Sequence, residues 1–577
     1  MSTVNRKEYL TATVLDQGLL DRCQDNLEQK LELVVDVETT YEMIRASDRN
    51  KYVDGVFYEA LTEFPVVKRS IGEWLDPTIE FSTLTVSLSN VDGRYNKLIA
   101  GGVDFGGWIG KEIQVRLGLR DVGSTYTTIY SGHITDVGGF QRDRTKITLI
   151  TRDDFDRVNI NIPPRVLASS SFPDIDENYV GNTLPIVYGD WTVELFDKNV
   201  DGVNGAAASI PAIPINGISA GVLAGTTSVH CVISDNDNLF LDLDNVYILR
   251  NNIYYKFNLA DVNSIGIGNK AIQIRQAGSG GTSLIEGALY QYVNGDAFFI
   301  RLKGKDLGSY QDNLVEQARD LLKTYGGLLA GEFDTNWDTY RDKASPAQSN
   351  IAGSKSRLWV QDSQSLVQYV LSMLEQVRLE MFLSRELKFK LSSLHFEDFQ
   401  ASPGYVIRNW DVVSSTFVPS LDEKNVWNRA AAAYAFDPAT RENGYETAIY
   451  RNSLAISQIN KEISKKVVFP NLYEKSTVIL QLIEMIKLAS GYSEFIEITL
   501  TPRAVLRDIG DFVLINVNMG SVIFENVPAM IRDISYDPNG LRVPVRLWSF
   551  QMLNFPGYSP GYSGMVGGST AVITEET

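Results

Sequence analysis

The sequence predicts a multidomain protein that is mainly β with α+β parts. It should contain two barrel-like β domains, an inserted β domain and a unit that combines helices with a hairpin. Apolar residues at every second position dominate residues 31–165 and 425–552, and this is the period of a strand buried on one face. At 577 residues the chain is also too long for one core, since domains average roughly 100–200 residues.

Five strands predict the first barrel-like domain, over residues 31–165. In FSTLTVSLSN (81–90), apolar and polar residues alternate before a turn at Asp92-Gly93. The other four strands are LELVVDVETT, KEIQVRLGLR, TTIYSGHITDV and TKITLITRDDF. We expect a closed or nearly closed antiparallel barrel, because closure removes exposed edges. The segment VFYEALTEFPVVKRSIGEWL is placed in the same domain, with Pro65 limiting its pairing. A helix or arm over residues 1–30 leads into it.

Residues 166–305 are predicted to form a long connection followed by the inserted β domain. The connection is rich in Pro, Ser and Asp, and Gly, Asn and Asp separate the short strands that begin near residue 192.

The α+β unit is predicted over residues 306–424. A first helix begins at Ser309 and stops at Gly326-Gly327. A second helix follows Asp362 as its N-cap and runs into a hairpin of residues 377–391.

The second barrel-like β domain is predicted over residues 425–552. It includes one helix, EKSTVILQLIEMIKLAS, and the strands FIEITLTP, DFVLINV, AMIRDISYD and VPVRLWSF. Residues 553–577 are rich in Gly, Pro and Ser, which is typical of a linker or docking tail.

The net charge of −18, from 71 Asp and Glu against 53 Lys and Arg, disfavours a nucleic-acid-binding surface. It suits a passage through which DNA slides without sticking. The two cysteines, Cys23 and Cys231, allow at most one disulfide. Neither a signal peptide nor a membrane segment is recognisable, so we expect synthesis and folding in the cytoplasm.

No catalytic, cofactor-binding or metal residue is predicted. The histidines, His133, His230 and His395, lie far apart, and only His230 has a cysteine neighbour, so packed or exposed structural roles are favoured over zinc or nucleophile chemistry. In GGWIGK (106–111), a phosphate loop would need glycine at Phe105 and Ser or Thr at Glu112, so it is interpreted as a barrel turn.

Two groups of acidic residues are further candidate sites. The carboxylates of Asp153, Asp154 and Asp156 end a strand and are interpreted as solvated. In DKNVDG, Asp197, Asn199 and Asp201 match alternate positions of a calcium loop. The twelfth position is Ala208, which cannot supply the bidentate carboxylate, so an ordinary turn is favoured over calcium binding.

From about residue 41 to residue 550, the chain resembles the baseplate hub, or tail tip, proteins of long-tailed bacteriophages. The phrases that carry the resemblance are GEWLDPTIEFSTLTVSLSNVDGRYN, YSGHITDVGGF, LPIVYGDW, ARDLLKTYGGL, VVFPNLYEKSTVILQLIEMIKLASG and LRDIGDFVLINV. Some relatives carry an iron–sulfur cluster or a peptidase domain, but two Cys and three His supply the residues for neither.

The resemblance implies a structural virion protein rather than an enzyme. Such hubs are homotrimers in which each subunit contributes two barrel-like domains, so that three copies present six similar surfaces to the hexameric tail tube. The expected role is to close the tube before DNA ejection and to attach the central fibre. The expected partners are the tail tube or distal tail protein, the tape measure protein and a central fibre or receptor-binding protein, with genomic DNA passing through the lumen. The alternatives are a tail-tip adhesin that binds surface glycan or a receptor, and a tail-associated hydrolase.

Overall fold

The computed structural model describes residues 31–550 and 573–575 with short interruptions. The interruptions are 40–41, 54, 61–64, 74–75, 80–82, 94, 96–106, 120–125, 139–144, 174, 176, 194–196, 202, 207–209, 216–227, 236–239, 266–270, 278–279, 294, 343–353, 385–386, 395–404, 414–417, 423–425, 491–492, 502–506, 519–522 and 537–541. The predicted arm (1–30) and most of the predicted tail therefore lie outside the described residues.

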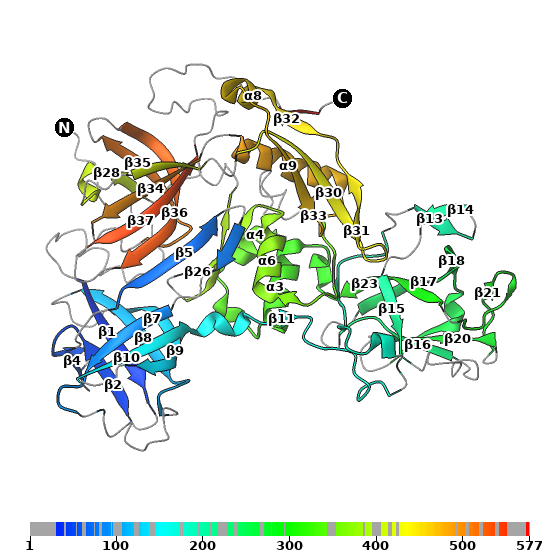
Figure 1. The fold of residues 1–577 in the computed structure, drawn as a ribbon, viewed down its shortest axis with the longest axis horizontal. Coiled ribbons are helices and arrows are strands. Elements are labelled where there is room, and N and C mark those ends of the chain that lie inside the picture. Colours follow the sequence, from blue (N-terminus) through cyan, green and yellow to red (C-terminus); the bar gives the residue numbers. More distant parts are fainter. Residues whose placement is uncertain are drawn as a thin grey trace.

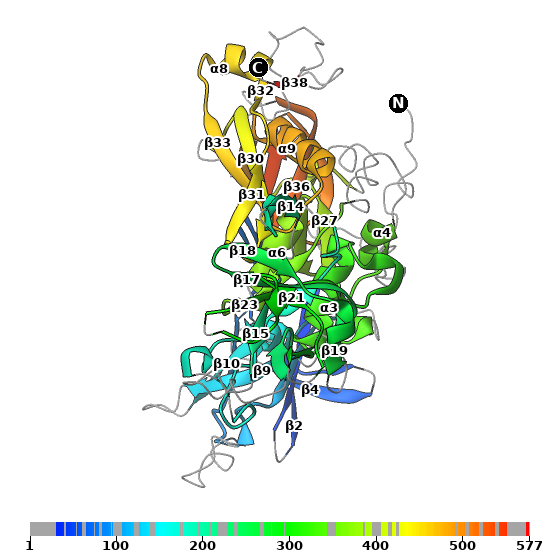
Figure 2. The ribbon, with the colours of Figure 1, turned by 90° about the vertical axis from the view of Figure 1, so that its right-hand side faces the viewer.

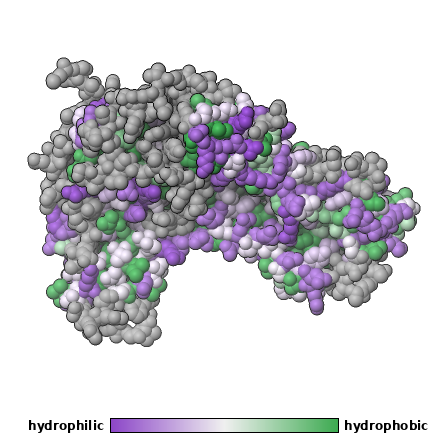
Figure 3. Space-filling view, turned by 45° about the horizontal axis from the view of Figure 1, so that its top comes forward, coloured by the Kyte–Doolittle hydropathy of each residue, from purple (hydrophilic) through white to green (hydrophobic). Residues whose placement is uncertain are grey.

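The predicted fold class, mainly β with α+β parts, is confirmed (Figure 1). Two β domains lie one above the other at one side of the molecule, a helical unit occupies the centre, and the inserted β domain projects at the other side. The view in Figure 2 shows a narrower molecule, and the surface in Figure 3 is hollowed between the first β domain and the inserted domain.

The first β domain is one curled eight-stranded sheet, ordered β3-β4-β2-β1-β8-β9-β10-β7. All five predicted strands are confirmed as members of this sheet. No described strand links the end strands β3 and β7, so the described part of the sheet is an open curl rather than a closed barrel. The bounds are β1 (Leu31–Glu38), β2 (Met43–Ser47), β3 (Lys51–Val53), β4 (Val56–Ala60), β7 (Thr83–Ser89), β8 (Glu112–Leu119), β9 (Thr127–Gly138) and β10 (Lys146–Asp153).

The second β domain takes strands from distant parts of the chain. Its main order is β28-β35-β36-β37-β34-β29, and β5 joins it by pairing with β36 and β6. The bounds are β5 (Val67–Glu73), β6 (Asp76–Ile79), β28 (Tyr405–Arg408), β29 (Val418–Asp422), β34 (Ser493–Leu500), β35 (Phe512–Asn518), β36 (Ile523–Tyr536) and β37 (Val543–Phe550).

The placement of β5 differs from the sequence prediction, which assigned it to the first domain. The physical reason is the length of β36. Its pairing with β35 ends at Met530, and β5 pairs with residues 533–536 beyond that point. Backbone groups in a sheet need partners, and β5 supplies them.

The central unit confirms two predicted helices and the predicted hairpin. Apolar residues form one buried face of α3 (Leu314–Thr324), whose N-cap Asn313 accepts from the Glu316 N–H. The predicted N-cap of the second helix was wrong, because Ser365, not Asp362, caps α6 (Leu366–Glu375). The short helix α4 (Asn336–Asp342) was not predicted. The remaining strands of this unit are β11 (Asn161–Ile162), β12 (Ile186–Tyr188), β24 (Leu358–Val360), β25 (Gln364–Ser365), β26 (Leu379–Leu383) and β27 (Phe389–Ser393).

Four strands that precede β34 form a separate sheet with β38, a strand from the predicted tail, and we call it the upper sheet. It is ordered β31-β30-β32-β38, with β33 on the other side of β30. The predicted helix is α9 (Lys475–Ala489), and its buried face shares one core with the central unit and the upper sheet. The bounds are β30 (Arg429–Asp437), β31 (Glu442–Glu446), β32 (Tyr450–Asn452), β33 (Ser464–Phe469) and β38 (Ile573–Glu575), with α8 (Ser453–Ile459) after β32.

The inserted domain is a nine-stranded sheet ordered β14-β13-β18-β17-β23-β15-β16-β20-β19, with its own core. A separate hairpin pairs β21 with β22. The bounds are β13 (Asp197–Val200), β14 (Val203–Ala206), β15 (Ile210–Pro214), β16 (Ser228–Val232), β17 (Phe240–Arg250), β18 (Ile253–Lys256), β19 (Val262–Ile265), β20 (Ala271–Arg275), β21 (Leu284–Ile285), β22 (Ala288–Leu289) and β23 (Ala297–Lys305).

Candidate functional site: a repeated β unit and its junction

Four strands of each β domain follow the same order. In the first domain, β8, β9 and β10 form a meander, and the preceding strand β7 pairs with β10. In the second domain, β35, β36 and β37 form the meander, and the preceding strand β34 pairs with β37. We call β7–β10 and β34–β37 the two repeated units.

Each repeated unit enters its meander through an Ile-Gly turn with the same hydrogen bonds. Gly110 has a φ of 77° and Gly510 a φ of 74°. Their N–H groups donate to the carbonyl oxygens of Ile134 and Ile531 at 2.7 and 2.8 Å. The carbonyl oxygen of the residue after each glycine accepts the N–H of the same isoleucine, at 2.9 and 3.0 Å. Glycine adopts this positive φ without steric cost, so the turn requires it in both units.

The middle strands of the two units are also interrupted at the same place. The pairing of β9 with β10 skips the central residue of 134–136 (Ile-Thr-Asp), and the pairing of β36 with β37 skips that of 531–533 (Ile-Arg-Asp). Such bulges re-aim one side chain. Thr135 is exposed in the first unit, whereas Arg532 is buried in the second. The two units therefore share their strand pairing and differ in whether the bulged side chain is exposed or buried.

Strand β5 joins the two repeated units. It pairs with β36 of the second unit, and its buried Arg69 reaches both units. The Arg69 Nη2 donates to the carbonyl oxygen of Ile129 on β9 at 2.5 Å, and Nη1 lies 3.6 Å from Asp508 Oδ1. Apolar residues of both domains form one continuous core. The two units are therefore connected by a strand pairing, a buried arginine and a shared core.

Arg532, the bulged residue of the second unit, pairs with Glu380 on β26 of the central unit. Its two terminal nitrogens donate to the two carboxylate oxygens, with Nη2 2.9 Å from Oε1. The side chains are 2% and 3% exposed, and the guanidinium lies 4.9 Å from the centre of the Trp548 ring. Because both charges are removed from water, each depends on the other.

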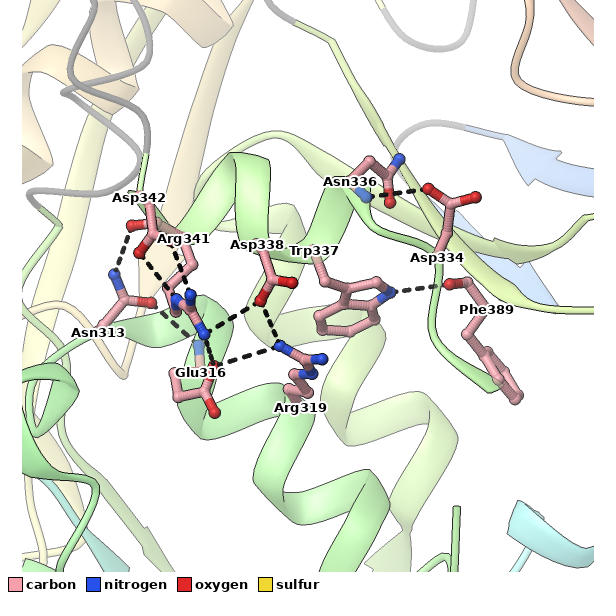
Figure 4. Close-up of polar contacts among 10 residues, drawn as sticks. All are labelled: Asn313, Glu316, Arg319, Asp334, Asn336, Trp337, Asp338, Arg341, Asp342 and Phe389. Carbon is pink, nitrogen blue, oxygen red and sulfur yellow. Dashed lines mark hydrogen bonds and ion pairs between the residues drawn. The ribbon is translucent and has the colours of Figure 1, made fainter. Parts of the chain in front are cut away.

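A second ionic cluster joins α3 to α4 on the central unit (Figure 4). Arg341 lies 3.3 Å from Glu316, 3.1 Å from Asp338 and 2.7 Å from Asp342. Arg319 lies 2.7 Å from the same Asp338 carboxylate. Nearby, the Trp337 indole N–H donates to the Phe389 carbonyl oxygen at 2.9 Å, which fixes α4 on β27.

The hydrogen bond from Arg341 lowers the pKa of Asp342 to about 2. A lowered carboxyl pKa adds stability that is present above the unfolded pKa near 3.9 and is lost as the pH falls towards about 2. Because the Asp342 side chain is partly exposed, we expect Asp342→Asn to lower protection of the α4 amides at pH 7 by less than about fivefold, equivalent to about 1 kcal/mol. Hydrogen exchange over residues 336–342 measures this. A loss above about tenfold, or an equal loss at pH 2, would contradict the assignment.

Among the described residues, the candidate histidines and cysteine form no cluster: His230 and Cys231 are consecutive on β16, so their side chains point to opposite faces of the sheet. Burial lowers the pKa of His230, whose Nε2 lies 3.4 Å from Ser228 Oγ. Burial also raises the pKa of the Cys231 thiol, which keeps it protonated and unreactive. His133 lies half-buried on β9. His395 and Cys23 lie outside the described residues.

The described parts of the candidate phosphate loop, the acidic group and the calcium-like segment all lie in ordinary structural elements. Gly110 of the GGWIGK segment belongs to the Ile-Gly turn described above. Asp153 is the buried end of β10, and Asp156 pairs with Arg152 at 3.0 Å. Residues 197–206, which include the calcium-like segment, form the β13–β14 hairpin, with Asp201 in the turn at a φ of 51°.

Within the described ranges, no group of three or more His, Cys, Asp or Glu side chains could hold a metal ion. None of the described helices is long and apolar enough to cross a membrane.

The sequence prediction missed Arg69, Glu380 and Arg532, because each depends on a partner far away in the chain. A signal for the repeated unit was nevertheless present. Ile-Gly precedes a strand at residues 109–110 and again at 509–510, and Ile-x-Asp recurs at 134–136 and 531–533.

The fold and the junction define a multidomain β protein with an internally repeated unit. No family model matches the sequence, and no curated protein matches it. Among solved structures, the tail protein from Neisseria meningitidis MC58 matches at 8% identity and a TM-score of 0.38, over 90% of this chain and 96% of that one.

Two further structures match at 10% identity. The 43 kDa tail protein of prophage MuSo2 from Shewanella oneidensis has a TM-score of 0.37, over 90% of this chain and 97% of that one. A chain of the native gene transfer agent virion has a TM-score of 0.35, over 67% of this chain and 87% of that one. All three are described as tail proteins or as part of a virion.

Proposed function

We propose that the chain is a structural virion protein at the distal end of a phage tail, where it forms the trimeric baseplate hub. The observation that carries the proposal is the repeated unit. One chain holds two units with the same strand order, the same Ile-Gly turn and the same bulge. Three chains would then supply six similar units, which is the number that a hexameric tail tube presents.

The junction between the units supports this role. A chain that joins a three-fold tip to a six-fold tube must hold its two units at one fixed relative position. The pairing of β5 with β36, the contacts of Arg69 and the shared apolar core provide such a connection. The central unit then braces the second repeated unit through Arg532 and Glu380.

In this role the hub closes the tube before DNA ejection, contacts the tail tube and the tape measure protein, and attaches the central fibre. The excess of carboxylates is assigned to the wall of the DNA passage, because cations there would bind phosphate and retain the genome. Repulsion by an acidic wall acts over roughly 8–10 Å at physiological salt.

The mass of the purified full chain tests the proposal, together with its copy number in the particle. We expect light scattering or native mass spectrometry to give three chains per complex, and quantitative analysis of tails to give three copies per tail. A tail-tip adhesin would instead bind host cells by itself, so cell binding by the isolated chain is the matched comparison. A monomer or dimer within the assembled particle would refute the proposed function.

A further inference from the structure

The upper sheet ends at an open strand edge. Strand β33 pairs in parallel with β30 on one side, and no described strand pairs with its other side. A groove of about 300 Å³ runs along this open edge. Consecutive residues 465–470 line one wall, the C-terminal end of α6 lines the other, and Trp427 and Met485 contribute apolar surface. An edge strand beside a helix is the arrangement that accepts an added strand.

The groove contains an unsatisfied hydrogen-bond donor. Trp427 is 3% exposed, and its indole N–H is buried without a hydrogen-bond partner among the residues that the structure describes. The Lys465 ammonium lies 5.6 Å from the centre of the Trp427 ring, and Val468 is half exposed on the strand. The indole N–H groups of Trp108 and Trp359 are also buried without a partner among the described residues, and Trp427 is the one of the three that lines this groove.

The opposite margin of the same sheet offers a complementary edge (Figure 2). Strand β38 pairs with β32 on one side, and no described strand pairs with its other side. Glu575 on β38 is exposed, and its carboxylate lies 3.4 Å from the Tyr450 hydroxyl. The β33 margin of the sheet therefore presents Lys465, with Glu375 of α6 lining the groove beside it, and the other margin presents Glu575. Lys466 already pairs with Glu446.

We propose that β33 of one copy pairs with β38 of the next copy, so that the upper sheet continues from subunit to subunit around the trimer. The occupant of the groove is a second copy of this chain. Pairing β33 with β33 would place lysines against lysines, and pairing β38 with β38 would place glutamates together, and both arrangements are unfavourable. Only the head-to-tail pairing joins opposite charges.

A head-to-tail contact closes into a ring when the rotation between copies permits. The number three rests on the proposed function, whereas the pairing of the two edges rests on the upper sheet alone. The entering strand would also bring backbone carbonyl oxygens into the groove beside the Trp427 indole N–H.

Lysines on an edge strand also serve in many proteins to prevent pairing with other chains. An attractive role and a protective role for Lys465 predict opposite results. If Lys465 attracts the neighbouring edge, its charge reversal weakens association. If Lys465 guards the edge, its charge reversal leaves the trimer intact and promotes aggregation.

The test is a charge exchange in the full chain, followed by mass photometry across a dilution series. We expect Lys465→Glu to weaken trimer formation by about tenfold or more, and the double variant K465E/E575K to restore it to within about threefold of the wild type. Lys466 is left unchanged because it already pairs with Glu446. The matched control is Lys256→Glu, an exposed lysine at the end of β18 in the inserted domain.

Crosslinking provides a second test, which does not depend on the folding of K465E. The double variant K465C/E575C should crosslink between copies under mild oxidation, giving species of two and three chains on a non-reducing gel. The edge pairing would be overturned if the K465E trimer were as stable as the wild-type trimer and K465C/E575C formed no crosslinks between copies. The proposed function would still stand. A wild-type chain that is not trimeric in the particle would refute the proposed function itself, while intermolecular crosslinks would still report the edge pairing.

Discussion

Glu380→Ala is expected to destabilise the contact between the second β domain and the central unit by about 3–5 kcal/mol. The substitution leaves the Arg532 guanidinium, which is 2% exposed, without its carboxylate partner. Water cannot replace that partner in a closed interior, so most of the penalty is the cost of an uncompensated buried charge. The effect should appear locally, as faster hydrogen exchange and proteolysis at β26 and β36.

The control is the replacement of both members by apolar residues. E380M/R532M removes both charges together, and we expect it to be near neutral or to cost less than about 2 kcal/mol. The matched ion pair between Lys466 and Glu446 is more than half exposed on both sides, and K466A should change stability by less than about 1 kcal/mol. A cost of E380A as small as that of K466A would show that the Arg532 charge is accessible to water.

Gly510→Ala is expected to destabilise the second repeated unit by about 2–5 kcal/mol. An alanine at a φ of 74° costs about 1–2 kcal/mol through backbone strain. A methyl group at this position would also overlap the ring of Phe382, which is buried on β26, and overpacking a core adds about 1–3 kcal/mol.

The equivalent glycine of the first unit supplies the control. Gly110 has nearly the same φ, 77°, but a methyl group there meets no atom within 4 Å. Gly110→Ala should therefore cost only the strain, about 1–2 kcal/mol. Urea unfolding followed by hydrogen exchange on β8 and β35 compares the two sites. Equal costs at the two glycines would show that the central unit does not press on the second Ile-Gly turn.

The strands and long helices could be predicted because their signals are local. The alternation in β8, β10 and β35 records one buried face of each of these strands. The face of α3 and that of α9 record a helical period in the same way. Each signal lies within a few residues of the element that it specifies.

The partners of these elements could not be predicted because they are set by distant surfaces. The alternation of β5 does not reveal that its partner is β36 rather than a neighbour in sequence. The strands of the upper sheet carry the same signal as those of the second β domain, so the boundary between the two sheets was not visible. The N-cap of α6 was misplaced because Asp362 and Ser365 are both good capping residues, and only the backbone selects Ser365.

The candidate site was the least predictable part of the molecule. Its residues are arginines and a glutamate, which in the sequence look like any of the many other charged residues. What makes Arg69, Glu380 and Arg532 distinctive is their burial, which arises only when β5 and the bulge of β36 are in place. The Ile-Gly and Ile-x-Asp pairs mark the two units only once the strand pairing is known, because Ile-Gly also occurs at 71–72, 265–266 and 267–268 and Ile-x-Asp at 233–235 and 509–511.

Cryo-electron microscopy of the tail tip in the assembled particle tests the central claim most directly. We expect three copies of this chain around the tail axis, with β7–β10 and β34–β37 alternating as six similar units against the tube. We also expect the wall facing the DNA passage to be net acidic. A map with another copy number, with the two units of a chain outside a common ring, or with Arg and Lys lining the narrowest point would contradict the account.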